Sequence, residues 1–392
     1  MLKQFLLDSS PKNQIYKDVY RLIHQYAPIS KAELLPKIKL TTSTLARVID
    51  ELLDNGYIRK YGVEDIGRGR PPVLYHIDER CSYLIGINIT RMKVSVVLLD
   101  LLYNQVDQES FIMTSMHNPD FVLTKIKDIT FNFMEKYQIT LDELLGIGIA
   151  SVGVLDKTNG IVLQPGGFLN SEWENTPVAE ILGKDIPVKI MLENLPNAAV
   201  LGEYKYTKSI EDNILYWISG GWGLGCGALV NGEILPIDIK GLMHMVVDIN
   251  GRECSCGKRG CLITYTSPYN LLDELTTRRP SINISKEKLS SVSIDEIMEF
   301  LRQGDTLIEE IVMESAYYLG VGISNIANLF QSKMIIIKGP LIETYPNYFN
   351  KVMESVEKHV QQNEQLRFSQ GVLKENAAAI GAAIYIHETY LS

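Results

Sequence analysis

The sequence contains few cysteines, five among 392 residues. A small, odd number of thiols argues against a disulfide framework and fits a reducing compartment. The sequence also has no run close to the roughly 20 uninterrupted apolar residues that a membrane helix needs. Its start, MLKQFLLDSSPKNQ, has no long apolar segment of the secretory type. We therefore expect a cytoplasmic protein without a membrane association.

The sequence also has no overall excess of basic residues, and its net charge is −9. Residues 1–79 nevertheless hold 12 Lys and Arg against 10 Asp and Glu, whereas the remainder holds 26 against 37. An acidic body repels nucleic acid, but a mildly basic N-terminal segment can bind it locally. With 46% hydrophobic residues, the chain is long enough for two or three globular domains.

Residues 1–79 predict a winged helix-turn-helix domain. Apolar residues recur at helical spacing over 15–26 and again over 45–53. Between these two helices, Ser30 and Glu33 have the spacing of a capping box, which starts a short second helix. The apolar runs YIRKYG and PPVLYHI follow and can pair as a hairpin. A small helical module that binds protein is the alternative interpretation.

The third helix offers candidate contacts to a double-stranded DNA operator. A recognition helix turns its polar face to the major groove. The segment GRGRPP, after the third helix, has arginines that suit a narrow minor groove, although a solvated turn is the plainer reading. The predicted DNA-binding residues are Thr42, Ser43, Thr44, Arg47, Arg68 and Arg70.

The remaining residues, 80–392, predict an α/β body. Buried strands such as LIGINI and LLGIGIAS alternate with amphipathic helices, and a second strand–glycine-loop–strand series begins at NILYWISGG. Two similar halves suggest a duplicated fold with a cleft between two lobes, which is where pockets tend to form. Three of the five cysteines gather in RECSCGKRGC, at Cys254, Cys256 and Cys261. From the residues alone, a metal site, a redox pair and buried thiols all remain open.

Motifs spread in order along nearly the whole chain resemble the ROK family, and within it the repressor branch of the xylose-repressor or N-acetylglucosamine-repressor type. The matching motifs are GIGIASVGVLD, ENLPNAAVLGE, GGWGLGCGALVNGEI, GRECSCGKRGCL, NLFQSKMIIIKGPL and AAAIGAAIYI. The resemblance implies an actin-like ATPase fold for the body, with a lobe boundary near 195–212 and a C-terminal helix returning to the first lobe. It also implies a homodimer or homotetramer.

The resemblance extends to a metal site. In the family a histidine precedes the cysteines and all four residues bind zinc; the matching histidine here is His244, in KGLMHMVVD. One imidazole and three thiolates form a closed tetrahedral set, which is typical of structural zinc. We therefore expect one structural zinc per chain, held by His244, Cys254, Cys256 and Cys261.

The departures from the family pattern indicate a body without kinase activity. Kinase members have an aspartate after Glu-Asn that takes the proton from the sugar hydroxyl; here Leu195 stands there and cannot accept a proton. The first glycine loop is replaced by the segment 88–92, NITRM. Trp222 and Lys338 stand where the family has a small hydroxyl residue and a glycine.

The sequence predicts a sugar site that is weakened but not lost in this body. The family's sugar contacts map to Asn194 and His244, with Asn170 in a neighbouring motif, and these are the predicted effector-binding residues. Three family carboxylates are replaced by Leu195, Leu242 and Ile263. Losing such acceptors weakens sugar binding by roughly 1–3 kcal/mol each. The effector is then a sugar or a regulatory protein.

The sequence as a whole predicts a DNA-binding transcriptional repressor, tied to carbohydrate metabolism, on a catalytically dead sugar-kinase fold. An active sugar kinase with an added DNA-binding head is one alternative. A repressor controlled by a protein partner is the other.

Overall fold

A computed structural model describes residues 2–8, 10–62, 72–165, 168, 170–207, 213–220, 223–235, 239–281, 294–361 and 366–391. The chain forms two compact units. The first consists of Met1–Asn194 with Ala379–Ser392, and the second of Leu195–Ala378. The chain therefore passes from one unit to the other twice.

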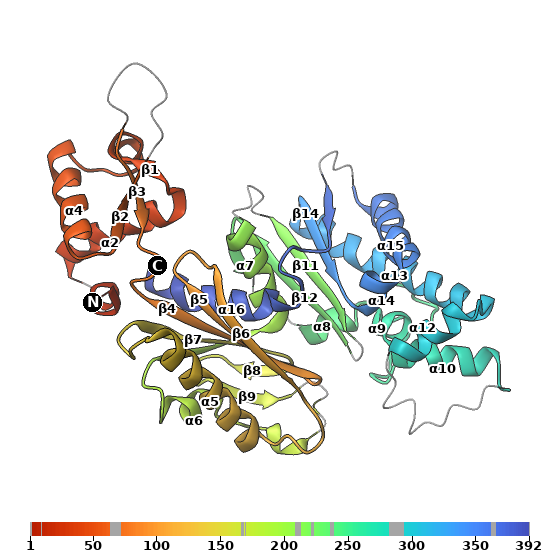
Figure 1. Cartoon of the computed structure of the whole chain (residues 1–392). Coiled ribbons are helices and arrows are strands. Elements are labelled where there is room, and N and C mark those ends of the chain that lie inside the picture. The colour runs from red at the N-terminus through yellow and green to blue at the C-terminus, as the bar shows by residue number, and fades with distance from the viewer. Residues whose placement is uncertain are drawn as a thin grey trace. The chain divides into compact units, whose positions relative to one another are not determined.

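The N-terminal part of the first unit, here called the head, is a winged helix-turn-helix (Figure 1). Its strands form an antiparallel sheet in the order β1-β3-β2. The fold prediction is confirmed, and α1 is an additional helix that the sequence pattern did not indicate. The elements are α1 (Leu2–Leu7), α2 (Pro11–Tyr26), β1 (Ile29–Ser30), α3 (Lys31–Leu34) with the 3-10 turn Leu35–Lys37, α4 (Thr42–Asp54), β2 (Ile58–Tyr61) and β3 (Leu74–Ile77).

Local sequence signals explain where the head's short elements begin and end. The predicted capping box is present, because Ser30 Oγ accepts the Glu33 N–H at 3.3 Å and the Glu33 carboxylate accepts the Ser30 N–H at 2.9 Å. Gly56, with a φ of +70°, follows the end of α4 in the left-handed region that favours glycine. It turns the chain from α4 into β2.

The rest of the first unit, here called the first lobe, is a five-stranded sheet with helices on both faces. The strand order is β10-β7-β4-β5-β6, with β4, β7 and β10 parallel to one another. The strands are β4 (Tyr83–Ile89), β5 (Lys93–Asp100), β6 (Gln105–Ile112), β7 (Leu144–Ser151) and β10 (Lys189–Asn194), with a hairpin of β8 (Val154–Asp156) and β9 (Ile161–Gln164). The helices are α5 (Pro119–Tyr137), α6 (Val178–Gly183) and α16 (Ala377–Leu391), with a 3-10 turn at Ser171–Trp173.

The two faces of this sheet are covered differently. The apolar side of α5, including Val122 and Ile126, joins one hydrophobic core with alternate residues of β4 and β7. On the opposite face, Gly86 and Gly148 let α16 approach the sheet, because a Cβ atom there would lie 2.0 Å from the Ala379 carbonyl oxygen and 1.8 Å from that of Ala382. The backbone of α16 therefore lies directly on the sheet, without side chains between.

The second unit repeats the connectivity of the first lobe. Its strand order is β13-β12-β11-β14-β15, in which β11 pairs antiparallel with β12 and parallel with β14, as β4 does with β5 and β7. The duplication predicted from the sequence is therefore present. The strands are β11 (Ile214–Gly220), β12 (Gly223–Val230), β13 (Glu233–Leu235), β14 (Met334–Lys338) and β15 (Arg367–Ser369).

Helices α7 to α15 build the remainder of the second unit. Helices α8 to α15 share one large apolar core with β11, β12 and β14, whereas α7 packs against β11 and β12 without joining that core. Their bounds are α7 (Leu195–Thr207), α8 (Ile239–Met243), α9 (Ile263–Thr266), α10 (Pro268–Arg278), α12 (Ile294–Arg302), α13 (Thr306–Phe330), α14 (Pro340–Thr344) and α15 (Pro346–His359). Among the described residues of the whole chain, no helix is both long and apolar enough to cross a bilayer.

Candidate functional site

The polar face of α4 is exposed at its N-terminal end. Thr41 caps the helix, since its Oγ1 accepts the Thr44 N–H at 3.2 Å. Thr42, Ser43 and Arg47 are exposed, whereas Thr44 is half-buried and its hydroxyl lies 2.8 Å from that of Thr41. The opposite side of α4 is buried through Leu45, Val48, Ile49 and Leu52. Three of the predicted DNA contacts are thus exposed, although the hydroxyls of both Ser43 and Thr44 lie within hydrogen-bond distance of the Thr41 hydroxyl.

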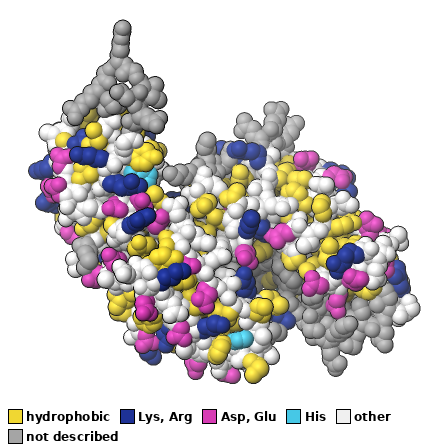
Figure 2. Space-filling view, viewed as in Figure 1, with side chains coloured by type: hydrophobic (Ala, Val, Ile, Leu, Met, Phe, Trp, Pro, Cys, Tyr) yellow, Lys and Arg dark blue, Asp and Glu magenta, His cyan; other side chains and the backbone are white. Residues whose placement is uncertain are grey.

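Arg47 lies near two other side chains, Tyr16 and Glu51. Burial and the adjacent Glu51 raise the pKa of Tyr16, while Arg47 lowers it, so these three side chains meet where α2 contacts α4. Figure 2 shows basic and acidic side chains interspersed on the visible face of the head. Arg68 and Arg70, the predicted minor-groove contacts, lie outside the described residues.

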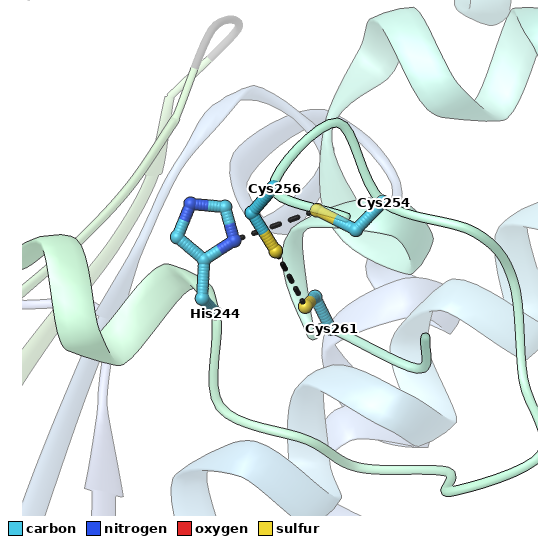
Figure 3. A group of neighbouring side chains, drawn as sticks. All are labelled: His244, Cys254, Cys256 and Cys261. Carbon is cyan, nitrogen blue, oxygen red and sulfur yellow. Dashed lines mark hydrogen bonds between the residues drawn. The ribbon is translucent and has the colours of Figure 1, made fainter. Parts of the chain in front are cut away.

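The second unit brings four predicted metal ligands together (Figure 3). The ligand atoms of His244, Cys254, Cys256 and Cys261 all lie within 4.8 Å of one another. Cys254 Sγ is 3.4 Å from His244 Nδ1, and Cys256 Sγ is 3.6 Å from Cys261 Sγ. A disulfide bond is about 2.05 Å long, so the two sulfur atoms are not bonded. Ligand atoms of a tetrahedral metal centre lie roughly 3.5–3.8 Å apart, given usual metal–sulfur and metal–nitrogen distances.

Tight backbone turns shape this cluster, here called the cysteine knuckle (residues 252–261). The Cys254 N–H donates to the Lys258 carbonyl oxygen at 2.8 Å. Gly260 has a φ of +72°, and a Cβ atom there would lie 1.5 Å from the Asp248 carbonyl oxygen. The backbone N–H of Lys258 lowers the pKa of Cys256, whereas burial raises the pKa of Cys261 to about 12. Arg259 pairs with Glu253 and donates to the Gly251 carbonyl oxygen at 3.3 Å.

An aromatic and ionic network braces the cysteine knuckle against the helices. The Tyr265 hydroxyl accepts the Arg252 N–H at 3.1 Å and donates to Asp248 Oδ2 at 3.4 Å. The Tyr265 and Tyr318 rings lie 3.9 Å apart. The Arg252 guanidinium reaches Glu314 of α13 at 2.8 Å. Distortion of the knuckle is therefore expected to reach α9 and α13.

The predicted effector residues differ in how their polar atoms are used. Asn170 is already engaged, because its Oδ1 accepts the Glu172 N–H at 2.8 Å and its Nδ2 donates to the Ser115 carbonyl oxygen at 3.2 Å. Asn194 Oδ1 is buried without a hydrogen-bond partner. Asn170 and Asn194 belong to the first unit and His244 to the second. Of the two asparagines, Asn194 therefore presents an unused acceptor and Asn170 does not.

Sequence reasoning missed a polar cluster at the carboxyl ends of β4 and β10. Asn88 and Glu193 pair in register with the same residue of β7, Ala150. Glu193 is 2% exposed and accepts hydrogen bonds from Lys157 Nζ and from the Asn194 N–H. Asn88 Oδ1, like Asn194 Oδ1, is buried without a partner. The signal was the position of Asn88 and Glu193 at strand ends, where ligands of parallel sheets bind.

At two positions where the sequence departs from the kinase pattern, the side chain is engaged by a nearby residue. These positions are Thr90 and Lys338. The Thr90 hydroxyl donates to the Lys93 carbonyl oxygen at 2.8 Å and accepts the Lys93 N–H at 3.1 Å, so the β4–β5 turn folds onto itself. Lys338, at the end of β14, has a side chain 12% exposed and pairs with Glu343 at 2.6 Å. Trp222 lies outside the described residues.

Two curated repressors are similar to this chain over most of its length. The xylose repressor of Bacillus spizizenii is 28% identical over 370 residues, which cover 93% of this chain and 92% of that protein. The DNA-binding transcriptional repressor Mlc of Escherichia coli K12 is 24% identical, over 86% of this chain and 84% of that protein.

Solved structures give the same picture of the fold. A ROK family transcriptional regulator, described as a homologue of the E. coli MLC protein, superposes with a TM-score of 0.74 at 25% identity over 96% of both chains. The ROK hexokinase of Thermus thermophilus superposes with a TM-score of 0.65 at 19% identity, over 78% of this chain and 99% of its own. The hexokinase likeness shows that the body shares its fold with sugar kinases.

Family sequence models match two separate parts of the chain. A MarR family model matches residues 19–64, within the head. A ROK family model matches residues 84–389, which is more than half of the sequence. The chain therefore belongs to the ROK family.

Proposed function

We propose that this protein is a sequence-specific DNA-binding transcriptional repressor of carbohydrate-metabolism genes and that its kinase-like body senses without catalysing. The observation that carries the proposal is the exposed polar face of a capped recognition helix, α4, joined to a ROK body with leucine at the position of the catalytic base. The repressor relatives support the same function.

The proposed DNA contacts are supported by the exposure of the N-terminal part of α4 and by the chemistry of the residues. Thr42, Ser43, Thr44 and Arg47 at the N-terminal part of α4 would meet the major groove of a double-stranded operator. Arg68 and Arg70 would enter the adjacent minor groove. Phosphate contacts from the rest of the head would position these residues without adding specificity.

The absence of catalysis is supported by two observations. Leu195 is 6% exposed and offers no proton acceptor where a kinase needs a base. The ammonium of Lys338 is held by Glu343 where the family has a glycine near the adenosine. Both substitutions affect separate parts of a phosphoryl-transfer mechanism, so a single reversion would not restore it.

An effector would act through differential binding. Asn194, with its unused acceptor, and His244 are the residues proposed to contact a sugar; Asn170 is a weaker candidate because its side chain is engaged in the loop. The lost carboxylates leave a regulatory protein as the alternative signal. In either case a coupling free energy of about 1–3 kcal/mol between effector binding and operator binding changes operator affinity roughly 5- to 150-fold.

The donor set of the cysteine knuckle fits structural zinc, one ion per chain. His244, Cys254, Cys256 and Cys261 would occupy all four tetrahedral positions, so the metal would stabilise the fold and leave no open position for chemistry. A repressor of this kind acts in the cytoplasm, where DNA is available and thiols stay reduced. Half-sites read by two heads imply a homodimer or homotetramer.

Selection of genomic fragments by the purified protein at physiological salt tests the proposal. One sequence class should be enriched, and Arg47→Ala should weaken binding to it roughly 5- to 150-fold, as expected for a lost base contact. Arg80→Ala is the matched control, since Arg80 is exposed, carries the same charge and lies outside α4. Enrichment no greater than that of random DNA would contradict the proposal.

A further inference from the structure

The outer side of α2 contacts the first lobe at two points. His24 Nε2 lies 3.0 Å from the Leu101 carbonyl oxygen, in the turn between β5 and β6. Arg21 Nη1 donates to the Leu391 carbonyl oxygen over 3.4 Å, at the C-terminal end of α16. Figure 1 shows that end, marked C, beside the head. The head is therefore in contact with two lobe elements that are far apart in sequence.

The ring of His24 packs against two buried rings of the first lobe, those of Tyr103 and His387. Its ring centroid lies 4.8 Å from that of His387 and 5.3 Å from that of Tyr103, both with edge-on geometry. The Tyr103 hydroxyl is 3.0 Å from His387 Nδ1 and donates to Glu388 Oε1 at 3.4 Å. Tyr103 is 4% exposed and His387 0%. These contacts form what we call the head latch, namely Arg21, His24, Leu101, Tyr103, His387 and Leu391.

The lobe side of the head latch is rigidly attached to the sheet. The backbone of α16 lies directly against Gly86 and Gly148. Near its end, the Tyr390 hydroxyl donates to the Leu145 carbonyl oxygen at 2.9 Å, and Lys189 Nζ donates to the Thr389 hydroxyl at 2.7 Å. Since interiors this closely packed do not deform gradually, His387 moves only with the sheet.

The segment that joins the head to the lobe is held as well. The Leu101 N–H donates to the Glu79 carbonyl oxygen at 3.1 Å. The Glu79 carboxylate accepts two hydrogen bonds from Arg59 of β2, each 3.0 Å long. Glu79 thus ties the wing of the head to the β5–β6 turn. The head is therefore attached to this lobe through α2 and through Glu79.

We propose that the head latch holds the DNA-binding head in one orientation on the first lobe, with His24, Tyr103 and His387 as positioning residues for operator binding. The proposal rests on the DNA-binding function given above. A signal acting on the body would move the head together with the first unit, and would not release it. In an oligomer, the latch then fixes the spacing of half-sites that two heads can read.

Operators with two half-sites at a series of spacings test this role. Wild type should prefer one spacing over spacings shifted by half a helical turn by roughly tenfold, because a rigid connection concentrates the second head at one distance. Arg21→Ala with His24→Ala should reduce that preference below about threefold, while affinity for a single half-site stays unchanged. Gln25→Ala, an exposed neighbour on α2, is the control. Full spacing preference in the double variant would overturn the proposal.

A measurement without DNA separates the latch from the proposed function. Spin labels introduced as unnatural amino acids at the exposed Lys60 of the head and Asp128 of α5 report the distance between head and lobe. Wild type should give a single narrow distance, which is lost in the double variant and kept in Gln25→Ala. A wild-type distribution as broad as that of the double variant would overturn the latch, even if operator binding is intact. Failure of wild type to bind any DNA would instead refute the repressor function alone.

Discussion

The two five-stranded sheets have one connectivity but different carboxyl edges. In the first lobe, β7 ends in the small residues Ala150 and Ser151, and the neighbouring strands contribute Asn88 and Glu193. In the second unit, the corresponding strand β14 ends in Lys338, which is held by Glu343. Both edges carry an ion pair, Lys157 with Glu193 and Lys338 with Glu343, but the first also has the buried acceptors Asn88 Oδ1 and Asn194 Oδ1 without partners. The scaffold is shared, and function depends on what the strand ends and loops carry.

The two units also differ in the structural feature that each one holds in place. The first unit carries the head, which α16 and the β5–β6 turn hold in place. The second unit carries the cysteine knuckle, braced on α9 and α13. Perturbing each attachment should therefore affect mainly its own unit.

Removal of the zinc ion that we propose for the cysteine knuckle should have the largest effect and should act on the second unit. Metal binding and folding are linked, so Cys261→Ser or a chelator should destabilise this unit by several kcal/mol, on the order of 5 kcal/mol. Thermal unfolding and metal analysis by mass spectrometry check this, with about one zinc per chain expected in wild type. Cys81→Ser, which lies in the first unit, is the control and should keep the metal. A metal-free protein with the wild-type melting temperature would refute the site.

Gly148 and Gly227 each lie against the backbone of a helix, one in each unit. Replacing either glycine with alanine should destabilise mainly the unit that contains it. In Gly148→Ala the new Cβ meets the Ala382 carbonyl oxygen at 1.8 Å, and in Gly227→Ala it meets that of Pro196 at 2.2 Å. Each change should destabilise its unit by about 3 kcal/mol, since backbone must shift. Denaturant titration measures the loss, and Gly148→Ala should also weaken operator binding. Gly183→Ala, whose nearest contact is 3.9 Å, should cost nothing. Equal stability of all three variants would contradict the described packing.

Breaking the ion pair at each edge should give unequal, smaller effects. The Glu193 side chain is 3% exposed and that of Glu343 46% exposed. Glu193→Gln should therefore cost about 1–3 kcal/mol, and Glu343→Gln less than about 1 kcal/mol, because exposed pairs contribute little. Urea unfolding of both variants provides the comparison. If the Glu343 variant were the less stable one, the assigned difference between the edges would be wrong.

Local signals in the sequence predicted much of this molecule. The capping box at Ser30 and the helical spacing of Leu45, Val48 and Ile49 depend on near neighbours, and both were confirmed. The four candidate metal ligands lie within 18 residues of one another, from His244 to Cys261, so the cluster could be predicted from spacing and resemblance.

Contacts between distant segments could not be predicted. α1 has six residues, too few to be stable alone, and its formation depends on burying Leu2 and Leu6. Asn88 and Glu193 come to the same level of the sheet only because their two strands pair in register with β7. The contact of His24 with His387 requires the whole lobe to fold between them. No local pattern encodes such pairings.

Release of the operator by an unphosphorylated sugar, without ATP, tests most directly whether the body senses without catalysing. A protein–operator complex is titrated with pentoses, hexoses and amino sugars, with and without ATP and Mg²⁺, and affinity is followed by fluorescence anisotropy. The account predicts that an active sugar lowers operator affinity roughly 5- to 150-fold by itself and that ATP changes nothing. Release that occurs only with ATP and Mg²⁺, together with a phosphorylated sugar in the mixture, would contradict it.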